Sequence, residues 1–295
     1  MDFDKEKIIA HFGANFHTKV LDDLSKYAEL WGLSCFEQID AYNRNCLFKC
    51  VSDKHGLCVL KIGDDANLAE NERRVLREYN GGRFCKLYEA DTANGVLLIE
   101  RIVPGTQLQD EPDLDKRIDI FCELLRGLHI KPADKDSYVS YMTLVNNMTE
   151  FMSTHEGYDE LYAKMVKAQE IYCCLHEKYP NEMLLHNDLY HKNILSGSDS
   201  GSISDYRIID PDGAFVGVAV IDIPGFIYRE YFNGNADKMS YITNAISEKL
   251  NVSARDIWCA EYVIECMNVC YSVTYGGEPN LIIILLAEKM MNDLS

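Results

Sequence analysis

The segment over residues 184–213 constrains this chain more than any other feature, because it sets reactive polar residues between apolar ones. Its first part reads LLHNDLYHKNIL and contains the pattern H-x-D-x-x-x-x-N. Its last part reads IIDPDG and places an aspartate 17 residues after the asparagine. The apolar pairs predict short buried strands, which would hold the polar loop on a rigid scaffold. The fold must therefore provide a core beneath a loop of chemically active side chains.

Three side chains of this segment suit phosphoryl transfer. Asp188 offers a carboxylate that can orient an attacking hydroxyl group or accept its proton. Asn193 and Asp210 offer an amide oxygen and a second carboxylate, which are hard ligands of the kind that Mg²⁺ prefers. In phosphotransferases such a metal ion bridges the phosphates of a nucleotide. We therefore expect Asp188 to act on a hydroxyl group, and Asn193 and Asp210 to bind Mg²⁺.

An upstream lysine and glutamate extend this expectation. Glu72 falls inside the apolar stripe of a helix predicted over residues 67–80, whereas the other charged residues of that helix lie on the opposite side. A buried carboxylate needs a partner, and Lys61 lies near the end of an apolar strand predicted over residues 57–62. A strand lysine that faces a helix glutamate holds nucleotide phosphates in kinases. A purely structural ion pair between helix and sheet is the alternative.

The pattern of predicted elements divides the chain into two parts. Strands are predicted over residues 46–51, 57–62, 84–89 and 96–102, with the helix over 67–80 between the second and the third. Mainly helical patterns follow, over residues 114–130, 149–179 and 254–275. We therefore expect an α+β lobe over residues 1–102 and a mainly helical lobe over residues 103–295.

The charge balance excludes some classes of protein. The chain has 29 Lys and Arg against 47 Asp and Glu, a net charge of −18, which argues against a basic nucleic-acid-binding protein. The same excess agrees with an acidic cytosolic protein and with a site for a cationic ligand. The apolar run over residues 281–287 is too short to cross a bilayer, and the start of the chain lacks a signal-peptide pattern. We expect a cytoplasmic protein with no membrane partner.

The motifs resemble those of the aminoglycoside phosphotransferase and choline kinase group, which shares the protein-kinase-like fold. The resemblance covers about residues 35–275 and is strongest to the aminoglycoside/hydroxyurea resistance kinases, which include streptomycin 6-phosphotransferases. Besides the segments above, three stretches in the family's order carry it: LKIGD at 60–64, LLIERIVPG at 97–105 and LLRGLHIKP at 124–132. The resemblance implies a bilobal fold, with ATP or GTP bound together with Mg²⁺ at the junction of the lobes.

The resemblance also implies roles for residues of the nucleotide site. Lys61 would contact the phosphates, and Glu72 would orient that lysine. Backbone groups of Glu100 and Ile102, in the strand that links the lobes, would bind the adenine.

The loop residues receive roles from the same resemblance. Asp188 would be the catalytic base, with His186 bracing the loop, and Asn193 and Asp210 would be the Mg²⁺ ligands. Asn187 departs from the aminoglycoside kinases, which usually have glycine there, and resembles the choline kinases instead.

The acceptor site is less well marked. The resemblance implies acidic residues around an acceptor with amine groups, and Asp222 matches a family position after the metal-binding aspartate. Glu261 and Glu265 lie four apart on a predicted helix and would face the same way. The three carboxylates are therefore candidates for a cationic small molecule, although a solvated helix face is the alternative for the last two.

Three functions stay open at this stage. The first is ATP- and Mg²⁺-dependent phosphorylation of a hydroxyl group on a small molecule, with an aminoglycoside as candidate. The second is a kinase for choline, another amino alcohol or a different metabolite. The third is a kinase-like nucleotide-binding module without activity, which the glycine-free turn between Gln38 and Leu47 favours.

Overall fold

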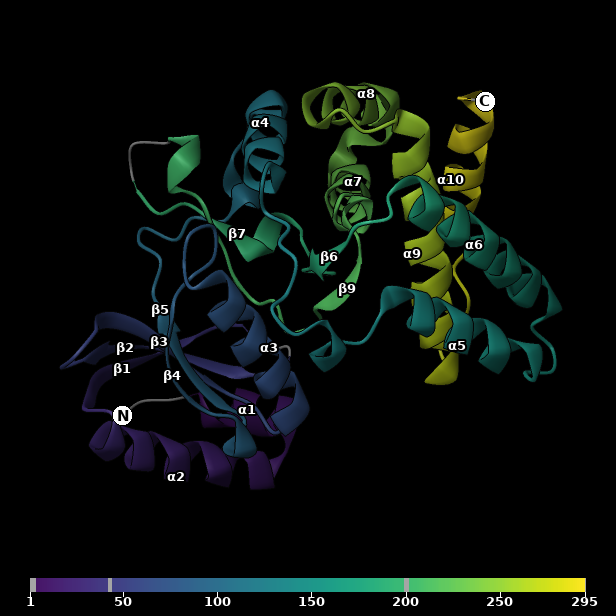
Figure 1. Cartoon of the computed structure of the whole chain (residues 1–295). Coiled ribbons are helices and arrows are strands. Elements are labelled where there is room, and N and C mark those ends of the chain that lie inside the picture. The colour runs from purple at the N-terminus through teal and green to yellow at the C-terminus, as the bar shows by residue number, and fades with distance from the viewer. Residues whose placement is uncertain (1–3, 42–43, 199–201, 295) are drawn as a thin grey trace. The chain divides into compact units, whose positions relative to one another are not determined.

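The computed structural model describes residues 4–41, 44–198 and 202–294 (Figure 1). The chain forms two compact units, each described here by itself. The first unit contains Met1–Thr106 and Leu195–Gly213, and the second contains Gln107–Ile194 and Ala214–Ser295. The sequence prediction placed the boundary after residue 102 and assigned residues 195–213 to the second part. They lie in the first unit because Ile208 pairs with its backbone: the N–H of Ile208 donates to Arg83, and its carbonyl accepts from Cys85.

An antiparallel sheet of five strands forms the centre of the first unit, with the order β1-β2-β3-β5-β4. Its strands are β1 (Leu33–Ile39), β2 (Cys46–Ser52), β3 (Gly56–Ile62), β4 (Leu87–Asp91) and β5 (Val96–Glu100). The predicted strands correspond to β2 to β5, although β4 begins three residues later than expected. No prediction was made for β1, or for α1 (Lys5–Phe12) and α2 (Ala14–Leu30).

The core of the first unit lies between the sheet and these two helices (Figure 1). Residues of β2 alternate between buried and half-buried, which is the period of two that a strand with one covered face requires. Phe48 and Leu60 are fully buried and belong to one cluster with Ile8 of α1 and Val20 of α2. The N-terminal helices therefore complete the core on which β3 is held.

Helix α3 (Ala66–Tyr79) carries the predicted apolar stripe. It begins at Asp65, whose side chain accepts hydrogen bonds from the backbone N–H groups of Asn67 and Leu68. It ends at Asn80 in a left-handed conformation (φ 46°), which asparagine tolerates. Both ends of the helix are thus set by local sequence.

The second unit is mainly helical, as predicted. Its α-helices are α4 (Leu114–Leu125), α5 (Tyr141–Ser153), α6 (Asp159–Lys178), α7 (Pro224–Glu230), α8 (Met239–Leu250), α9 (Ala254–Thr274) and α10 (Ile282–Asp293). Its short strands β6 (Glu182–Leu185) and β9 (Phe215–Val218) pair antiparallel. The helix predicted over residues 149–179 is in fact two, and Gly157 with φ 87° lies in the break.

Helix α9 is the central helix of this unit, with α6 and α10 packed against it (Figure 1). Trp258 and Tyr262 of α9 are fully buried and form part of the core of this unit. Over the described ranges, no helix combines the length and the apolar character that a membrane span requires.

We predict that Phe48→Ala lowers the free energy of unfolding by about 3 to 5 kcal/mol, because it removes a fully buried aromatic ring from the first unit's core. The matched control is Lys49→Ala, one residue along the same strand, whose amine pairs with Glu37 near the surface. It should cost less than about 1 kcal/mol. Urea denaturation measures both variants, and equal losses would contradict this account of the core.

Candidate active site

The first unit brings together three of the predicted residues, Lys61, Glu72 and Asp210. Lys61 ends β3 and Glu72 lies on the buried face of α3, and Lys61 Nζ is 2.6 Å from Glu72 Oε2. The same amine pairs with Oδ1 of Asp210, which follows β8 (Arg207–Ile208). Lys61 and Glu72 are almost fully buried, whereas the side chain of Asp210 is 35% exposed. Of these three side chains, only that of Asp210 is partly exposed, so solvent reaches this ion-pair cluster at the carboxylate of Asp210.

The charges of this cluster are strongly coupled. Burial raises the pKa of Glu72 to about 7, although the charge of Lys61 opposes this shift. Burial would lower the pKa of Lys61, but the carboxylates of Glu72 and Asp210 outweigh it and raise that pKa. Lys61 thus remains a cation at neutral pH, as a phosphate-binding group must.

The backbone of Asp210 is held in an uncommon conformation. Its φ of 65° lies in the left-handed region, which glycine enters freely and which asparagine and aspartate occupy at some cost. The chain after it is tied to α3, because the side-chain amide of Asn71 donates to the carbonyl of Asp212 at 2.7 Å. Such strain is found where surrounding structure fixes a functional group.

Glu100 and Ile102, predicted to bind adenine, lie at and beyond the end of β5. The backbone N–H of Glu100 donates to the carbonyl of Lys86 at 2.8 Å, so it is already used inside the first unit. No backbone hydrogen bond joins Ile102 to another residue of the described ranges. The backbone of Ile102 is thus better placed to meet a ligand than the N–H of Glu100.

The second unit carries the loop with Asp188. His186 follows β6 and is buried, and its Nδ1 accepts a hydrogen bond from the backbone N–H of Asp188 at 3.2 Å. The side-chain amide of Asn193 donates to the backbone carbonyl of Asp188 at 2.9 Å and to its Oδ2 at 3.3 Å. With its nitrogen used in this way, the amide oxygen of Asn193 is available as a metal ligand.

Asp222 holds the start of this loop through hydrogen bonds to its backbone. Its two carboxylate oxygens accept hydrogen bonds from the backbone N–H groups of His186 at 2.8 Å and Asn187 at 2.7 Å. His129 Nε2 lies 2.9 Å from Asp222 Oδ2. Burial is the largest single influence and would raise the pKa of Asp222, but the hydrogen bonds and charges of His129 and His186 together outweigh it, and the pKa lies below its ordinary value. Asp222 therefore holds the loop, and it also belongs to the lining of a cavity beside it.

The departure at Asn187 has a conformational explanation. Asn187 has a φ of 64°, so this position requires a residue that accepts the left-handed region. Glycine does so without strain and asparagine does so at a small cost. Asparagine can therefore replace the glycine of related kinases here without a change in the loop.

A cavity of about 400 Å³ opens in the second unit beside the loop. Its walls include Asp188, Glu261 and Glu265, together with aromatic side chains. The aromatic residues are Tyr141, Tyr190, Phe215, Tyr228 and Tyr271. The cavity also reaches Arg229, whose guanidinium lies 4.4 Å from the centre of the Tyr190 ring. This volume suits a small molecule, and aromatic walls with a few charged groups are typical of ligand pockets.

Glu261 and Glu265 do not form a solvated helix face, because they are only 1% and 8% exposed. Burial and then the nearby charge of Glu265 raise the pKa of Glu261 well above its ordinary value. Burial also raises the pKa of Glu265, although the amide of Asn268 donates to it at 2.9 Å. Glu261 Oε2 has no hydrogen-bond partner among the described residues. An acidic pair with an unpaired oxygen is suited to a cationic group.

Residues 40–231 match the family model described as aminoglycoside/hydroxyurea antibiotic resistance kinase. The chain belongs to this family. Membership makes it one of a set of small-molecule kinases and confirms the resemblance predicted from the motifs. A comparison with curated protein sequences found no match.

Solved structures are similar in fold. Aminoglycoside phosphotransferase APH(4)-Ia, in a ternary complex with ADP and hygromycin B, has a TM-score of 0.61 at 16% identity, over 92% of this chain and 96% of that one. Choline kinase LicA from Streptococcus pneumoniae has a TM-score of 0.64 at 15% identity, over 94% and 99%. An ethanolamine kinase of Plasmodium vivax has 0.65 at 14%, over 100% and 95%. The predicted α+β, protein-kinase-like fold is confirmed.

The motifs assigned no role to several residues that contact the loop or line the cavity. His129 lies in a stretch that carried the family resemblance, yet no pattern linked it to Asp222, 93 residues later. Arg229 and Tyr228 lie on α7, which was not predicted as a helix. Tyr42 and Asn43 of the glycine-free turn lie outside the described residues.

We predict that Asp222→Asn lowers the free energy of unfolding at pH 7 by about 3 kcal/mol, because the new amide faces backbone donors. The fold lowers the pKa of Asp222 below its ordinary value of 3.8. The carboxylate therefore contributes its full stabilisation of the folded state at pH values well above 3.8, and this contribution is lost as the pH falls through the pKa of the folded state. The deficit of the variant should therefore shrink in acid. Denaturation at several pH values measures this. Asp119→Asn, at a surface pair with Lys249, is the control and should cost under about 1 kcal/mol.

Proposed function

We propose that the chain is an ATP- and Mg²⁺-dependent kinase that phosphorylates a hydroxyl group on a cationic small molecule. One observation carries this proposal: Asp188 and the buried pair Glu261 and Glu265 line the same cavity. A carboxylate that can orient a hydroxyl group is thereby combined with acidic groups that can hold an amine. Family membership supports the reaction class, and the cavity supports the kind of acceptor.

The first unit supplies the nucleotide site in this proposal. Lys61, oriented by Glu72, binds phosphate oxygens, and the backbone of Ile102 meets the adenine, with Glu100 beside it. Asp210 of this unit and Asn193 of the loop in the second unit would be the Mg²⁺ ligands, because carboxylate and amide oxygens suit that ion. Bound there, the metal offsets negative charge on the phosphates. Among the described residues, no cluster of three or more His, Cys, Asp or Glu forms a separate metal site.

The loop supplies the catalytic base. Asp188 accepts the proton of the acceptor hydroxyl as the oxygen attacks the terminal phosphorus of ATP, and the bond from that phosphorus to the bridging oxygen breaks, so that ADP leaves. His186 and Asn193 hold Asp188 through its backbone N–H and its carbonyl. Asp222 anchors the loop through its hydrogen bonds to the backbone and, as a residue of the cavity lining, also stays a candidate for contact with the acceptor. Most of the rate gain then comes from positioning and electrostatics.

An amino alcohol is the second candidate for the acceptor, against an aminoglycoside. Asn187 gives the loop the H-N-D form that resembles choline kinases, and one buried acidic pair matches one cationic group. A panel of aminoglycosides, choline, ethanolamine and other hydroxylated metabolites, followed by ADP release, separates the two candidates. If nothing in the panel is phosphorylated while ATP and Mg²⁺ raise the melting temperature, the inactive nucleotide-binding module is favoured.

We predict that Asp188→Asn lowers kcat for the best acceptor of that panel by about 10²- to 10⁴-fold, because the hydroxyl loses its base. The affinity for ATP should stay unchanged, since Lys61 and Asp210 are intact. Asp237→Asn, an exposed aspartate in the same unit but not in the cavity wall, is the control and should keep full activity. An Asp188→Asn variant as active as the wild type would remove Asp188 from the mechanism.

We predict that binding of the cationic acceptor releases protons. The pKa of Glu261 is raised in the empty cavity, and a bound cation would lower it again. The affinity for the cationic acceptor should therefore increase with pH up to the pH at which Glu261 is already ionised in the ligand-free protein, and then level off. Titration calorimetry in buffers of different ionisation enthalpy measures the released protons. Glu261→Gln should reduce the release, with any remainder coming from Glu265, whose pKa is also raised, and an unchanged release in that variant would contradict the role of Glu261.

A further inference from the structure

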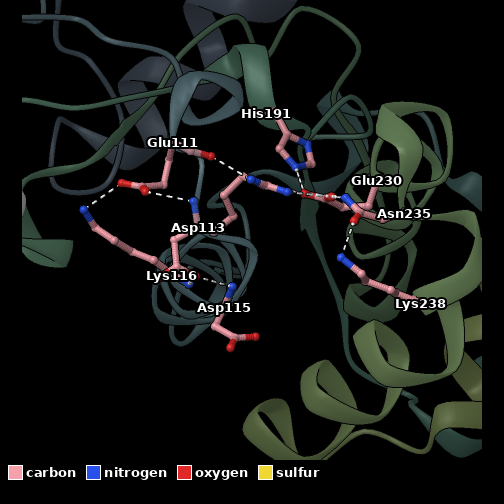
Figure 2. A network of polar contacts seen from close by, with 9 residues as sticks. Glu111, Asp113, Asp115, Lys116, His191, Glu230, Asn235 and Lys238 are labelled. Atoms are coloured by element: carbon pink, nitrogen blue, oxygen red, sulfur yellow. Dashed lines mark hydrogen bonds and ion pairs between the residues drawn. The ribbon is translucent and has the colours of Figure 1, made fainter.

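A second buried carboxylate, Glu230 at the end of α7, reaches the loop that carries Asp188 (Figure 2). His191 Nε2 lies 2.7 Å from Glu230 Oε1. Both side chains are buried, with exposed fractions of 1% and 0%. Because a carboxylate only accepts hydrogen bonds, Nε2 of His191 must be the donor. The orientation of the imidazole is therefore set by Glu230.

Glu230 is itself held on several sides. Arg117 of α4 donates from Nε to Oε1 at 2.7 Å and from Nη2 to Oε2 at 2.9 Å, a bidentate pair. Asn235 donates to Oε2 at 2.6 Å, and Lys238 donates to the side-chain oxygen of Asn235 at 3.2 Å (Figure 2). Burial opposes the charge of Glu230, but the hydrogen bonds from His191 and Arg117 lower its pKa to about 2. Glu230 is thus a fixed anion at neutral pH.

Packing fixes the remaining freedom of the His191 ring. The ring is stacked on Phe226 of α7 with centroids 4.3 Å apart, and Phe226 is stacked on Phe121 of α4 at 4.5 Å. The plane of the imidazole is set by these contacts, and its rotation in that plane is set by Glu230. Helices α4 and α7 therefore both hold one side chain of the loop.

That side chain starts the short turn η4 (His191–Asn193) between Asp188 and the end of the loop. The backbone N–H of Asn193 donates to the carbonyl of Tyr190 at 2.9 Å, and its side chain binds Asp188. A shift of His191 would therefore move Asn193 relative to Asp188. Such shifts are costly in catalysis, because a misplacement of about 1 Å can lower a rate about 10²-fold.

We propose that His191, held by Glu230 and Arg117, is a positioning residue that sets the geometry between Asp188 and Asn193. The proposal rests on the kinase function argued above. His191 acts through the turn and touches neither the acceptor nor the nucleotide. Asp222 anchors the beginning of the loop, and the network of Glu230 anchors its middle.

Two substitutions separate a hydrogen-bonding role from a packing role. His191→Phe keeps a ring against Phe226 but cannot donate to Glu230, whereas His191→Gln keeps a donor and loses the ring. Positioning by the hydrogen bond predicts that His191→Phe lowers kcat about 10²-fold, while KM for ATP and acceptor stays within about twofold. His191→Gln should keep kcat within about tenfold of the wild type. A role in packing alone predicts the reverse order, and that result would overturn the proposal.

A second measurement decides the proposal independently of turnover. Hydrogen exchange of the backbone amides over residues 188–193 should be faster in His191→Phe than in the wild type, and close to wild type in His191→Gln. Equal protection in His191→Phe and the wild type would overturn the proposal, even if no acceptor is found and the kinase function itself fails. Lys238→Met, at the exposed end of the network, is the control and should change neither exchange nor kcat.

Discussion

Buried carboxylates are the interactions on which the candidate active site depends. Glu72, Asp222 and Glu230 are each 2% exposed or less, and each would be costly to bury without partners. Glu72 meets Lys61, Asp222 meets two backbone N–H groups and His129, and Glu230 meets Arg117 and His191. Each carboxylate joins elements that are distant in sequence. In the first unit Glu72 fixes the lysine that pairs with Asp210, and in the second unit Asp222 and Glu230 hold the loop that carries Asp188 and Asn193.

Some of this network could be predicted from the sequence. Glu72 broke an apolar helical stripe, and a lysine ended an apolar strand, so local periodicity was enough to pair them. The loop with Asp188 and Asn193 was likewise visible as a spaced motif. The pattern of strands β2 to β5 also followed from residue alternation and turn residues, although β4 begins three residues later than predicted.

Other parts of the site leave no such signal. Asp222 was a candidate because it matches a family position, but its hold on the loop left no pattern, because it binds backbone N–H groups, which nearly every residue provides. Glu230 meets Arg117 and His191 across 113 and 39 residues, and only the tertiary fold brings them together. The spacing of Glu261 and Glu265 made them candidates, but their burial was hidden, because neither the spacing nor the net charge distinguishes a buried pair from carboxylates on the surface.

The return of Leu195–Gly213 to the first unit has a consequence for the order in which the chain folds during synthesis. A ribosome that has finished Thr106 has made the whole five-stranded sheet, but neither Ile208 nor Asp210. At about 5 to 20 residues per second, those partners emerge only after roughly 5 to 20 s. During that interval Glu72 is the only one of the two carboxylate partners of Lys61 that has been made. The backbone groups of Arg83 and Cys85 still lack Ile208, with which they form hydrogen bonds. The first unit is therefore completed only after about half of the second has been made, and Lys61 is among the last groups of the first unit to acquire its final surroundings.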